Sequence, residues 1–415
     1  MGDKGRKTPT ALLLQTMLKG FILLLFLALA IPALAQIDPE PRKLLHLGYN
    51  HPLRKRGPHE IYAFYYWNIP DIGGSNKTLR LVFAPTFFTS ELGFRGLLGE
   101  HTDLAVEVFG GGFYNNYDEV RGGKYFRDES FVGHGGGVNV SIYHLLNPGG
   151  AIPLNAVLAG KVDYHLFTED SRTADTFELP NDQPFLTLRG GLRFGGREPV
   201  LWPRLALEVS TWYELHHRPD SGRYGFAGDR ELKPTSHRVL GRIELAYTML
   251  ETKHRFNFGV IGGAVRDADR FSAYRVGGSL PFVSEYPLYM PGYFYKELSA
   301  EKFGLLYGNY TLPLDSAERF TFVAIGATGW VDYLDGLEQP GHWHSGVGGI
   351  LGYTTRNRRW RLGIGYNYGF NAIRDGSRGG HNVGMIFMYN FGDPKTASDR
   401  VFDQLLDVRT PRPGR

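Results

Sequence analysis

Long stretches in which apolar and polar residues alternate recur through most of this 415-residue chain. In LNAVLAGKVDYHLF (154–167), one face carries mainly apolar side chains and the other carries asparagine, lysine, aspartate and histidine. The same period of two runs through RLALEVSTWYEL (204–215), RVLGRIELAY (238–247) and RWRLGIGYNYGF (359–370). Alternation sustained over ten or more residues is typical of β-strands that cross a membrane. The sequence therefore predicts an all-β protein with unusually long strands.

The connections between these stretches favour a membrane barrel over a soluble β-sandwich. Short connections alternate with long polar ones, which is how outer-membrane barrels are built, whereas a sandwich has no reason to alternate loop lengths. The short connections are 147–150, 197–203, 251–254, 313–319 and 355–359, and the long ones are 118–133, 168–183, 216–236, 266–298, 334–344 and 371–380. We predict a transmembrane, antiparallel, up-and-down β-barrel over 59–392 with about fourteen strands, or about sixteen if a hairpin has been missed.

The N-terminus has the pattern of a cleaved export signal. Basic residues precede the apolar run FILLLFLALAI (21–31), and ALA (33–35) is followed by Gln36. The apolar run is shorter than the roughly 20 residues that a membrane-spanning helix needs, so we expect a signal peptide over 1–35. The mature chain would then lie in the outer membrane of a Gram-negative-type bacterium, with a short periplasmic segment over 36–58.

The residues after the last alternating stretch form a charged tail, 393–415, which we expect in the periplasm. This tail is a candidate contact for a periplasmic partner that the sequence does not identify. The other expected partners are outer-membrane lipids, lipopolysaccharide and, during insertion, the barrel-assembly machinery.

Composition excludes several other classes. The chain has no cysteine, so disulfides and cysteine metal sites are excluded. Its net charge of +4 is small for its length and does not indicate a nucleic-acid-binding surface. Its 55 glycines, together with many aromatic residues, suit strongly curved sheets.

One short motif, GHWHSG, combines residues that can do chemistry. His342 and His344 lie two apart, so in a strand they would share a face and could hold a metal or assist Ser345. No carboxylate or third ligand accompanies them at a recognisable spacing, which favours an ordinary rim pair. We therefore assign no catalytic, metal or cofactor residue and predict that the chain is not an enzyme, with an outer-membrane lipid-modifying enzyme as a distant alternative.

Charged side chains on four successive predicted strands form one candidate site. If the apolar faces meet lipid, the opposite faces line one wall of the lumen. This candidate lining consists of Lys161, Asp163, Arg189, Arg193, Glu208, Glu214, Arg242 and Glu244. A hydrated, mutually paired wall and a selectivity-setting channel lining are both compatible with the pattern, and the mixed sign favours the paired wall.

The loop after residue 266 is the second candidate site. Its stretch LPFVSEYPLYMPGYFY (280–295) is too apolar for a loop exposed to water. We predict that it folds into the barrel as a lid, with Pro291, Gly292 and Tyr293 at its tip. Tyr293 is expected to pack on inward residues of the lumen wall, such as Gly326, Thr328 and Trp330 or the face beside them, and an external plug against neighbouring loops is the alternative.

The last third of the chain resembles the C-terminal barrel of the BamA-like bacterial surface antigen superfamily, whose members insert or translocate proteins at outer membranes. The features that carry the resemblance are Gly277-Gly278 before the loop, the tip 291–293, the return at Glu297-Leu298, a strand ending at Pro313-Leu314, and the stretches GVGGILGYTT (346–355) and NVGMIFMYNF (382–391). The resemblance implies a role in protein translocation or assembly; a passive diffusion pore or a structural barrel is the alternative.

The chain departs from that family in three places. Pro291 stands where the family has an arginine at the loop tip, and Ala327, in IGATG (325–329), stands where it has the aspartate that pairs with this arginine. A chain that lacked only the arginine or only the aspartate would leave a buried charge unpaired. The absence of both residues avoids this cost. The family's periplasmic POTRA domains also have no counterpart between 36 and 58.

Overall fold

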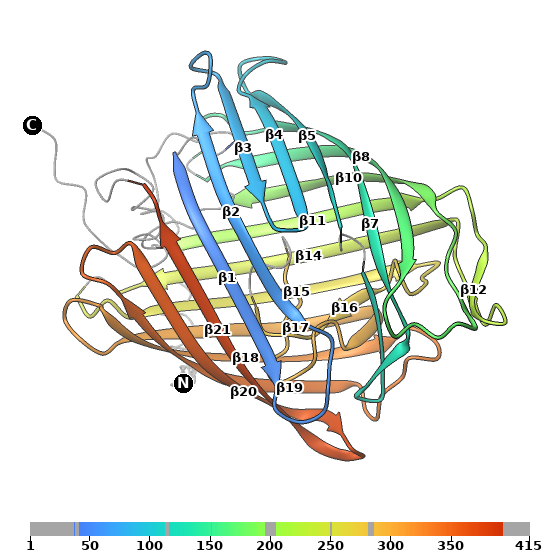
Figure 1. The fold of residues 1–415 in the computed structure, drawn as a ribbon. Helices are drawn as coiled ribbons and strands as arrows, with labels where there is room; N and C mark the ends of the chain where they lie inside the picture. The colour runs from blue at the N-terminus through green and yellow to red at the C-terminus, as the bar shows by residue number, and fades with distance from the viewer. Residues whose placement is uncertain are drawn as a thin grey trace, which may run out of the picture.

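The computed structural model describes residues 37, 41–112, 116–150, 152–195, 205–249, 251–280 and 286–392. The described chain is a barrel of antiparallel strands (Figure 1). None of the described residues forms a helix long and apolar enough to cross a membrane. The expected signal peptide and the tail 393–415 lie outside the described residues.

Sixteen strands close the barrel in up-and-down order. They are β1 (Arg42–Pro52), β2 (Glu60–Pro70), β3 (Lys77–Phe83), β4 (Phe87–Phe94), β5 (Thr102–Gly111), β7 (Lys124–Leu145), β8 (Leu154–Glu169), β10 (Gln183–Gly195), β11 (Leu205–His217), β14 (Thr235–Thr248), β15 (Arg255–Arg266), β17 (Leu298–Pro313), β18 (Phe320–Tyr333), β19 (Trp343–Thr354), β20 (Trp360–Arg374) and β21 (Ser377–Asn390). The barrel closes where β1 pairs with β21, from Leu44↔Asn390 to Pro52↔Asn382. The all-β transmembrane barrel is thus confirmed, with the larger of the two expected strand numbers.

The first strand corrects the expected domain boundary. The segment 36–58 was expected to lie in the periplasm, but it contains β1, so the barrel begins at Arg42 and not at residue 59. The burial of β1 alternates strictly, yet its sequence RKLLHLGYNHP places polar and apolar residues on both faces. Its periodicity is therefore weak in the sequence, and pairing with β2 and β21 decides its conformation.

The segment 371–380 was expected to be a long loop, and the structure also corrects this. Strands β20 and β21 continue to a two-residue turn, Asp375-Gly376, in which both residues have positive φ (56° and 73°). Asp-Gly is the preferred pair for this turn because both positions need left-handed backbone. The hairpin brings Arg374 to the outer end of the wall, where it faces the lumen.

Alternation along the strands separates a lipid face from a lumen face. Leu158, Val162, Ile243 and Ile364 remain 51–62 % exposed on the outer surface of the barrel, as expected for side chains that meet acyl chains. The connections 251–254, 314–319 and 355–359 lie at one end, and the long connections that follow β5, β8, β11 and β15 lie at the other. Following the arrangement of outer-membrane barrels, we call these the periplasmic end and the outer end.

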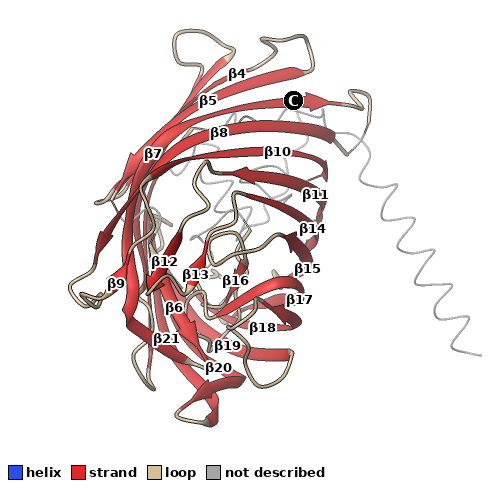
Figure 2. Cartoon of the chain, turned by 90° about the vertical axis from the view of Figure 1, so that its right-hand side faces the viewer, coloured by secondary structure: helices blue, strands red, loops and turns tan. Residues whose placement is uncertain are grey.

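A cap built from four loops covers part of the outer end (Figure 2). It contains β6 (Tyr117–Arg121), which pairs with β7, and a small sheet of β9 (Phe177–Glu178), β12 (Arg223–Phe226) and β13 (Arg230–Glu231). Buried aromatic residues form its core, and it also contains an ion network around Glu119. Burial alone would raise the pKa of the Glu119 carboxyl, but the nearby Arg270 and Arg230 guanidiniums hold it below its usual range.

The separation of faces predicts how the barrel responds to a charge. Ile243→Arg places a guanidinium against lipid and should lower the free energy of unfolding by about 2–4 kcal/mol. The matched control is Ala246→Arg, on the inward face of the same strand, which should cost far less because the new charge lies beside the Glu244 carboxylate. Urea titration of protein refolded into lipid vesicles measures both values. Equal losses would contradict the assignment of the two faces.

Candidate functional site: the inward loop and the lumen wall

The chain between β15 and β17 folds into the barrel, as expected. Strand β16 (Tyr274–Val276) pairs with the start of β17, and Figure 2 shows it within the ring of long strands. Residues 277–297, which we call the inward loop, follow. Gly277 and Gly278 have φ of 136° and 91°, and a bridge joins Gly278 to Met290, so the loop doubles back on itself. Within it, residues 281–285 lie outside the described part.

The tip of the inward loop packs on glycines from three neighbouring wall strands. A Cβ atom on Gly346 of β19 would collide with the carbonyl of Pro291, and one on Gly380 of β21 would collide with that of Gly292. Gly369 of β20 leaves room for the Tyr293 ring in the same way. Because these wall positions lack side chains, the backbone of the tip can lie directly against the sheet.

Tyr293 is completely buried at this contact. Its hydroxyl lies 3.0 Å from Nδ1 of His344, and its carbonyl accepts a hydrogen bond of 2.8 Å from Asn382. The other ring nitrogen of His344 lies 2.5 Å from the hydroxyl of Tyr333. A chain of polar contacts therefore fixes the tip to β18, β19 and β21.

The three wall partners named for Tyr293 were wrong, and the face beside them is the one that joins its buried cluster. Gly326, Thr328 and Trp330 lie on the outward face of β18, and the inward positions are the odd-numbered residues, such as Ala327 and Val331. The stretch FVAIGATGWV is apolar on both faces, so its sequence does not decide which face points inward.

A buried ion pair ties the return of the inward loop to the wall. The Arg374 guanidinium donates two hydrogen bonds of 2.9 Å to the Glu297 carboxylate, and both side chains are 0 % exposed. Glu297 also accepts a hydrogen bond of 2.7 Å from the backbone N–H of Phe294, and the guanidinium lies 3.5 Å from the centre of the Phe294 ring. The bidentate geometry makes this the strong form of a charge-assisted contact.

A second buried carboxylate holds the other limb of the loop. Glu60, at the start of β2, accepts hydrogen bonds from the backbone N–H groups of Ser279 (2.7 Å) and Leu280 (2.6 Å). It also accepts one from the side chain of Asn50 on β1. A Cβ on Gly278 would collide with this carboxylate, which accounts for the glycine there. The loop is thus anchored to the wall at both limbs.

The eight charged residues of the candidate lumen lining lie on the inward faces of β8, β10, β11 and β14. They form ion pairs with each other and with neighbouring residues of the wall. The pairs are Lys161–Asp163 (3.4 Å), Arg189–Glu214 (2.8 Å), Arg193–Glu208 (3.6 Å), Arg242–Glu208 and Arg242–Glu244 (3.6 Å), with Arg238–Glu214 (3.0 Å) added by a neighbour. The His165 ring also lies within hydrogen-bond distance of Asp163 (2.7 Å). This arrangement supports a mutually paired wall.

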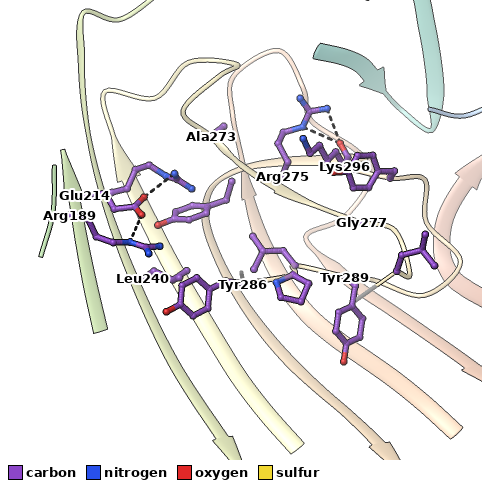
Figure 3. A pocket seen from close by; sticks show the side chains of 15 residues that line it. Arg189, Glu214, Leu240, Ala273, Arg275, Gly277, Tyr286, Tyr289 and Lys296 are labelled. Atoms are coloured by element: carbon purple, nitrogen blue, oxygen red, sulfur yellow. Dashed lines mark hydrogen bonds and ion pairs between the residues drawn. The ribbon is translucent and has the colours of Figure 1, made fainter. Parts of the chain in front are cut away.

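The inward loop also reaches this charged wall. The hydroxyl of Tyr286 accepts a hydrogen bond of 2.9 Å from Arg193, and the Arg242 guanidinium lies 4.5 Å from the centre of its ring. Between loop and wall lies a cavity of about 360 Å³ (Figure 3). In it, Arg189 points toward Glu214, while Arg275 donates to the carbonyl of Lys296. The loop therefore crosses the lumen from the charged wall to the glycine-lined wall.

The histidine motif does not bring the side chains of His344 and Ser345 together. His344 faces the lumen and contacts Tyr293, whereas Ser345 lies on the outward face, where its hydroxyl is 2.9 Å from Thr328. The side chain of His342 donates to the carbonyl of Val331. The described residues contain no group of three or more histidine and carboxylate ligands.

Three residues that position the loop were not found from the sequence: Glu60, Tyr286 and Arg374. The sequence did contain a signal for Arg374, because the Asp-Gly pair that follows it indicates a tight hairpin. Glu60 and Tyr286 contact residues more than 90 positions away in the chain, so no local pattern indicates their roles.

We predict that removing either partner of the Glu297–Arg374 pair releases the inward loop from the wall. Removing one partner leaves a buried charge unpaired, which costs about 3–5 kcal/mol. In Glu297→Gln or Arg374→Met the loop should detach, and trypsin should cleave after Lys296 at least about a hundredfold faster than in the wild type.

Two variants serve as controls for this experiment. Arg80→Met breaks an ion pair with Glu91 in the wall strands β3 and β4 and should leave Lys296 protected. The double variant Glu297→Leu/Arg374→Met should recover much of the protection, since apolar replacement of both partners is often neutral. Unchanged cleavage in both single variants would show that the pair does not hold the loop.

No protein-family model and no curated protein sequence matches this chain. The fold is similar to that of CdiB from Acinetobacter baumannii (TM-score 0.55, 10 % identity, covering 84 % of this chain and 60 % of that one). It is also similar to CdiB from Escherichia coli (0.57, 11 %, 87 % and 64 %) and to BamA from Haemophilus ducreyi lacking POTRA domains 1–3 (0.52, 9 %, 85 % and 71 %). The chain spans less than two thirds of the length of either CdiB. Its fold is that of the BamA-like outer-membrane barrels, as the sequence resemblance predicted.

Proposed function

We propose that this barrel is a gated conduit for polypeptide at the outer membrane, held closed by its inward loop. The observation that carries the proposal is the anchoring of the loop at both limbs, by Glu60 on one side and by Arg374 on the other. Together with the contact between Tyr286 and Arg193, these anchors place the loop across the lumen between opposite walls.

The kind of contact supports a gate more than a permanent plug. Among the described residues of this region, only the three of β16 pair with the barrel sheet, and they pair with β17 alone. The remaining contacts are hydrogen bonds, one ion pair and side-chain packing. Such contacts can break without disturbing the ladders that close the barrel, so release of the loop needs no unfolding of the wall.

The polypeptide client is inferred from the fold and the sequence resemblance. The likeness to CdiB and BamA establishes the fold, and the surface-antigen superfamily handles proteins at outer membranes. We further propose export by the signal peptide 1–35, contact with lipids and lipopolysaccharide, insertion by the barrel-assembly machinery, and a periplasmic partner that binds the tail 393–415.

A passive diffusion pore or a structural barrel is the alternative. The paired charges of the lumen wall would suit a hydrated pore. However, a passive pore needs an open lumen, and the inward loop lies across it. A lipid-modifying enzyme has less support, because its best candidates, His344 and Ser345, lie on opposite faces of β19.

Conductance in planar bilayers tests the proposal. The wild-type barrel should show low conductance with rare openings, because the loop occupies the lumen. Replacing residues 279–296 by a short Gly-Ser linker should give large, steady openings. Unfolded polypeptide added on the periplasmic side should then block these openings transiently.

The control for this recording is Arg80→Met, which should conduct like the wild type. Steady conductance of the wild-type barrel that is unchanged by loop replacement would indicate a passive pore. Large openings that added polypeptide does not block would contradict the proposal of a polypeptide client. They would still support the proposal that the loop is a gate.

A further inference from the structure

A second cavity lies at the periplasmic end of the barrel, away from the inward loop. It has a volume of about 350 Å³, within the range of small-molecule sites. Three successive periplasmic turns build it: 251–254 between β14 and β15, 314–319 between β17 and β18, and 355–359 between β19 and β20. Arg255 and Arg361 point into the barrel from β15 and β20, so the cavity opens on the lumen side of the rim.

The lining of this cavity is strongly basic. Its cationic residues are Lys253, Arg255, Arg319, Arg356, Arg358 and Arg361, and its only carboxylate is Glu318. The whole chain has a net charge of only +4, so six cations around one cavity are a local concentration. Hydroxyl groups of Ser316, Thr321, Thr354 and Thr355 complete the lining.

The carboxylates near the cavity are already engaged in holding two of the turns together. Glu318 forms ion pairs with Lys253 (2.8 Å) and Arg255, and Asp315 pairs with Arg319 (3.4 Å). The Lys253 ammonium also donates to the carbonyl of Ser316 (3.1 Å). These contacts fix the turns of β14–β15 and β17–β18 side by side.

The third turn adds positive charge without any carboxylate of its own. Its sequence, TTRNRRWR (354–361), contains four arginines and no acidic residue. Three of these arginines line the cavity, and Arg358 has a φ of 56°, a left-handed conformation that is uncommon for a residue other than glycine. Arginine groups combined with hydroxyl groups are the donors that bind carboxylate and phosphate best.

We propose that this periplasmic cavity binds an oligoanion, a ligand that carries two or more adjacent carboxylate or phosphate groups. Cations from three turns surround a volume larger than one such group needs, so neighbouring groups of one ligand can be bound together. A carboxylate ligand would come from an acidic stretch of polypeptide, and a phosphate ligand from a free oligophosphate. The site does not depend on the state of the inward loop.

Binding of two probes to the full-length barrel in nonionic detergent tests the proposal. One probe is a fluorescently labelled hexa-aspartate peptide and the other is tripolyphosphate, measured by anisotropy and by calorimetry. At least one should bind the wild type, and raising the salt concentration should weaken its binding. The variant Arg319→Gln/Arg356→Gln changes two exposed side chains, and its affinity should fall at least about tenfold.

The matched control is Arg54→Gln/Arg56→Gln, which removes the same charge from exposed residues of the β1–β2 loop at the outer end. It should bind like the wild type, and heat-modifiable mobility in gels should show that both variants are folded. Binding of hexa-aspartate alone would assign the ligand to polypeptide, and binding of tripolyphosphate alone would assign it to oligophosphates. The proposal is overturned if neither probe binds at millimolar concentration, or if both double variants lose affinity equally.

Discussion

The return of the inward loop is held to the barrel wall by the buried ion pair between Glu297 and Arg374. A buried pair contributes stability only when its geometry is good and its remaining donors and acceptors are satisfied. Here the contact is bidentate, Glu297 also accepts the N–H of Phe294, and Arg374 lies against the Phe294 ring and donates to the carbonyl of Ile373 (2.6 Å). Among the described residues, the Nε of Arg374 is the one nitrogen of this guanidinium without a hydrogen-bond partner. The pair positions the return of the inward loop, and the tip can then reach the glycines of β19, β20 and β21.

This pair can be compared with the one that the surface-antigen resemblance implied at the loop tip. In that family the loop tip supplies an arginine and the wall supplies an aspartate. This chain has Pro291 at the tip and Ala327, which is 7 % exposed, on the wall. Its loop supplies the carboxylate, Glu297, and its wall supplies the arginine, Arg374. The charges in this chain are thus arranged the other way round from that pattern, and Pro291 and Ala327 carry no charge that would need a partner.

Much of the fold was predictable from the sequence because alternation is a local property. The stretches at 154–167 and 238–247 show their two faces without knowledge of their partners, and the apolar character of 280–295 indicated burial. Strand β1 and the last four residues of β20, 371–374, were missed because their conformations depend on pairing with β21. The anchors of the loop depend on the register of distant strands, since 77 positions separate Glu297 from Arg374. Local patterns contain no information about such contacts, so the wall that receives Tyr293 had to come from the structure.

The most direct test of the account is the accessibility of the loop tip in intact cells. The chain has no cysteine, so Tyr293→Cys provides a single reactive thiol, and Arg54→Cys in the exposed β1–β2 loop provides a positive control. A bulky, membrane-impermeant maleimide should label residue 54 rapidly. It should leave residue 293 unlabelled in the otherwise unchanged protein and label it once Arg374→Met is added. Rapid labelling of residue 293 while Arg374 is present would place the tip outside the lumen and contradict the account.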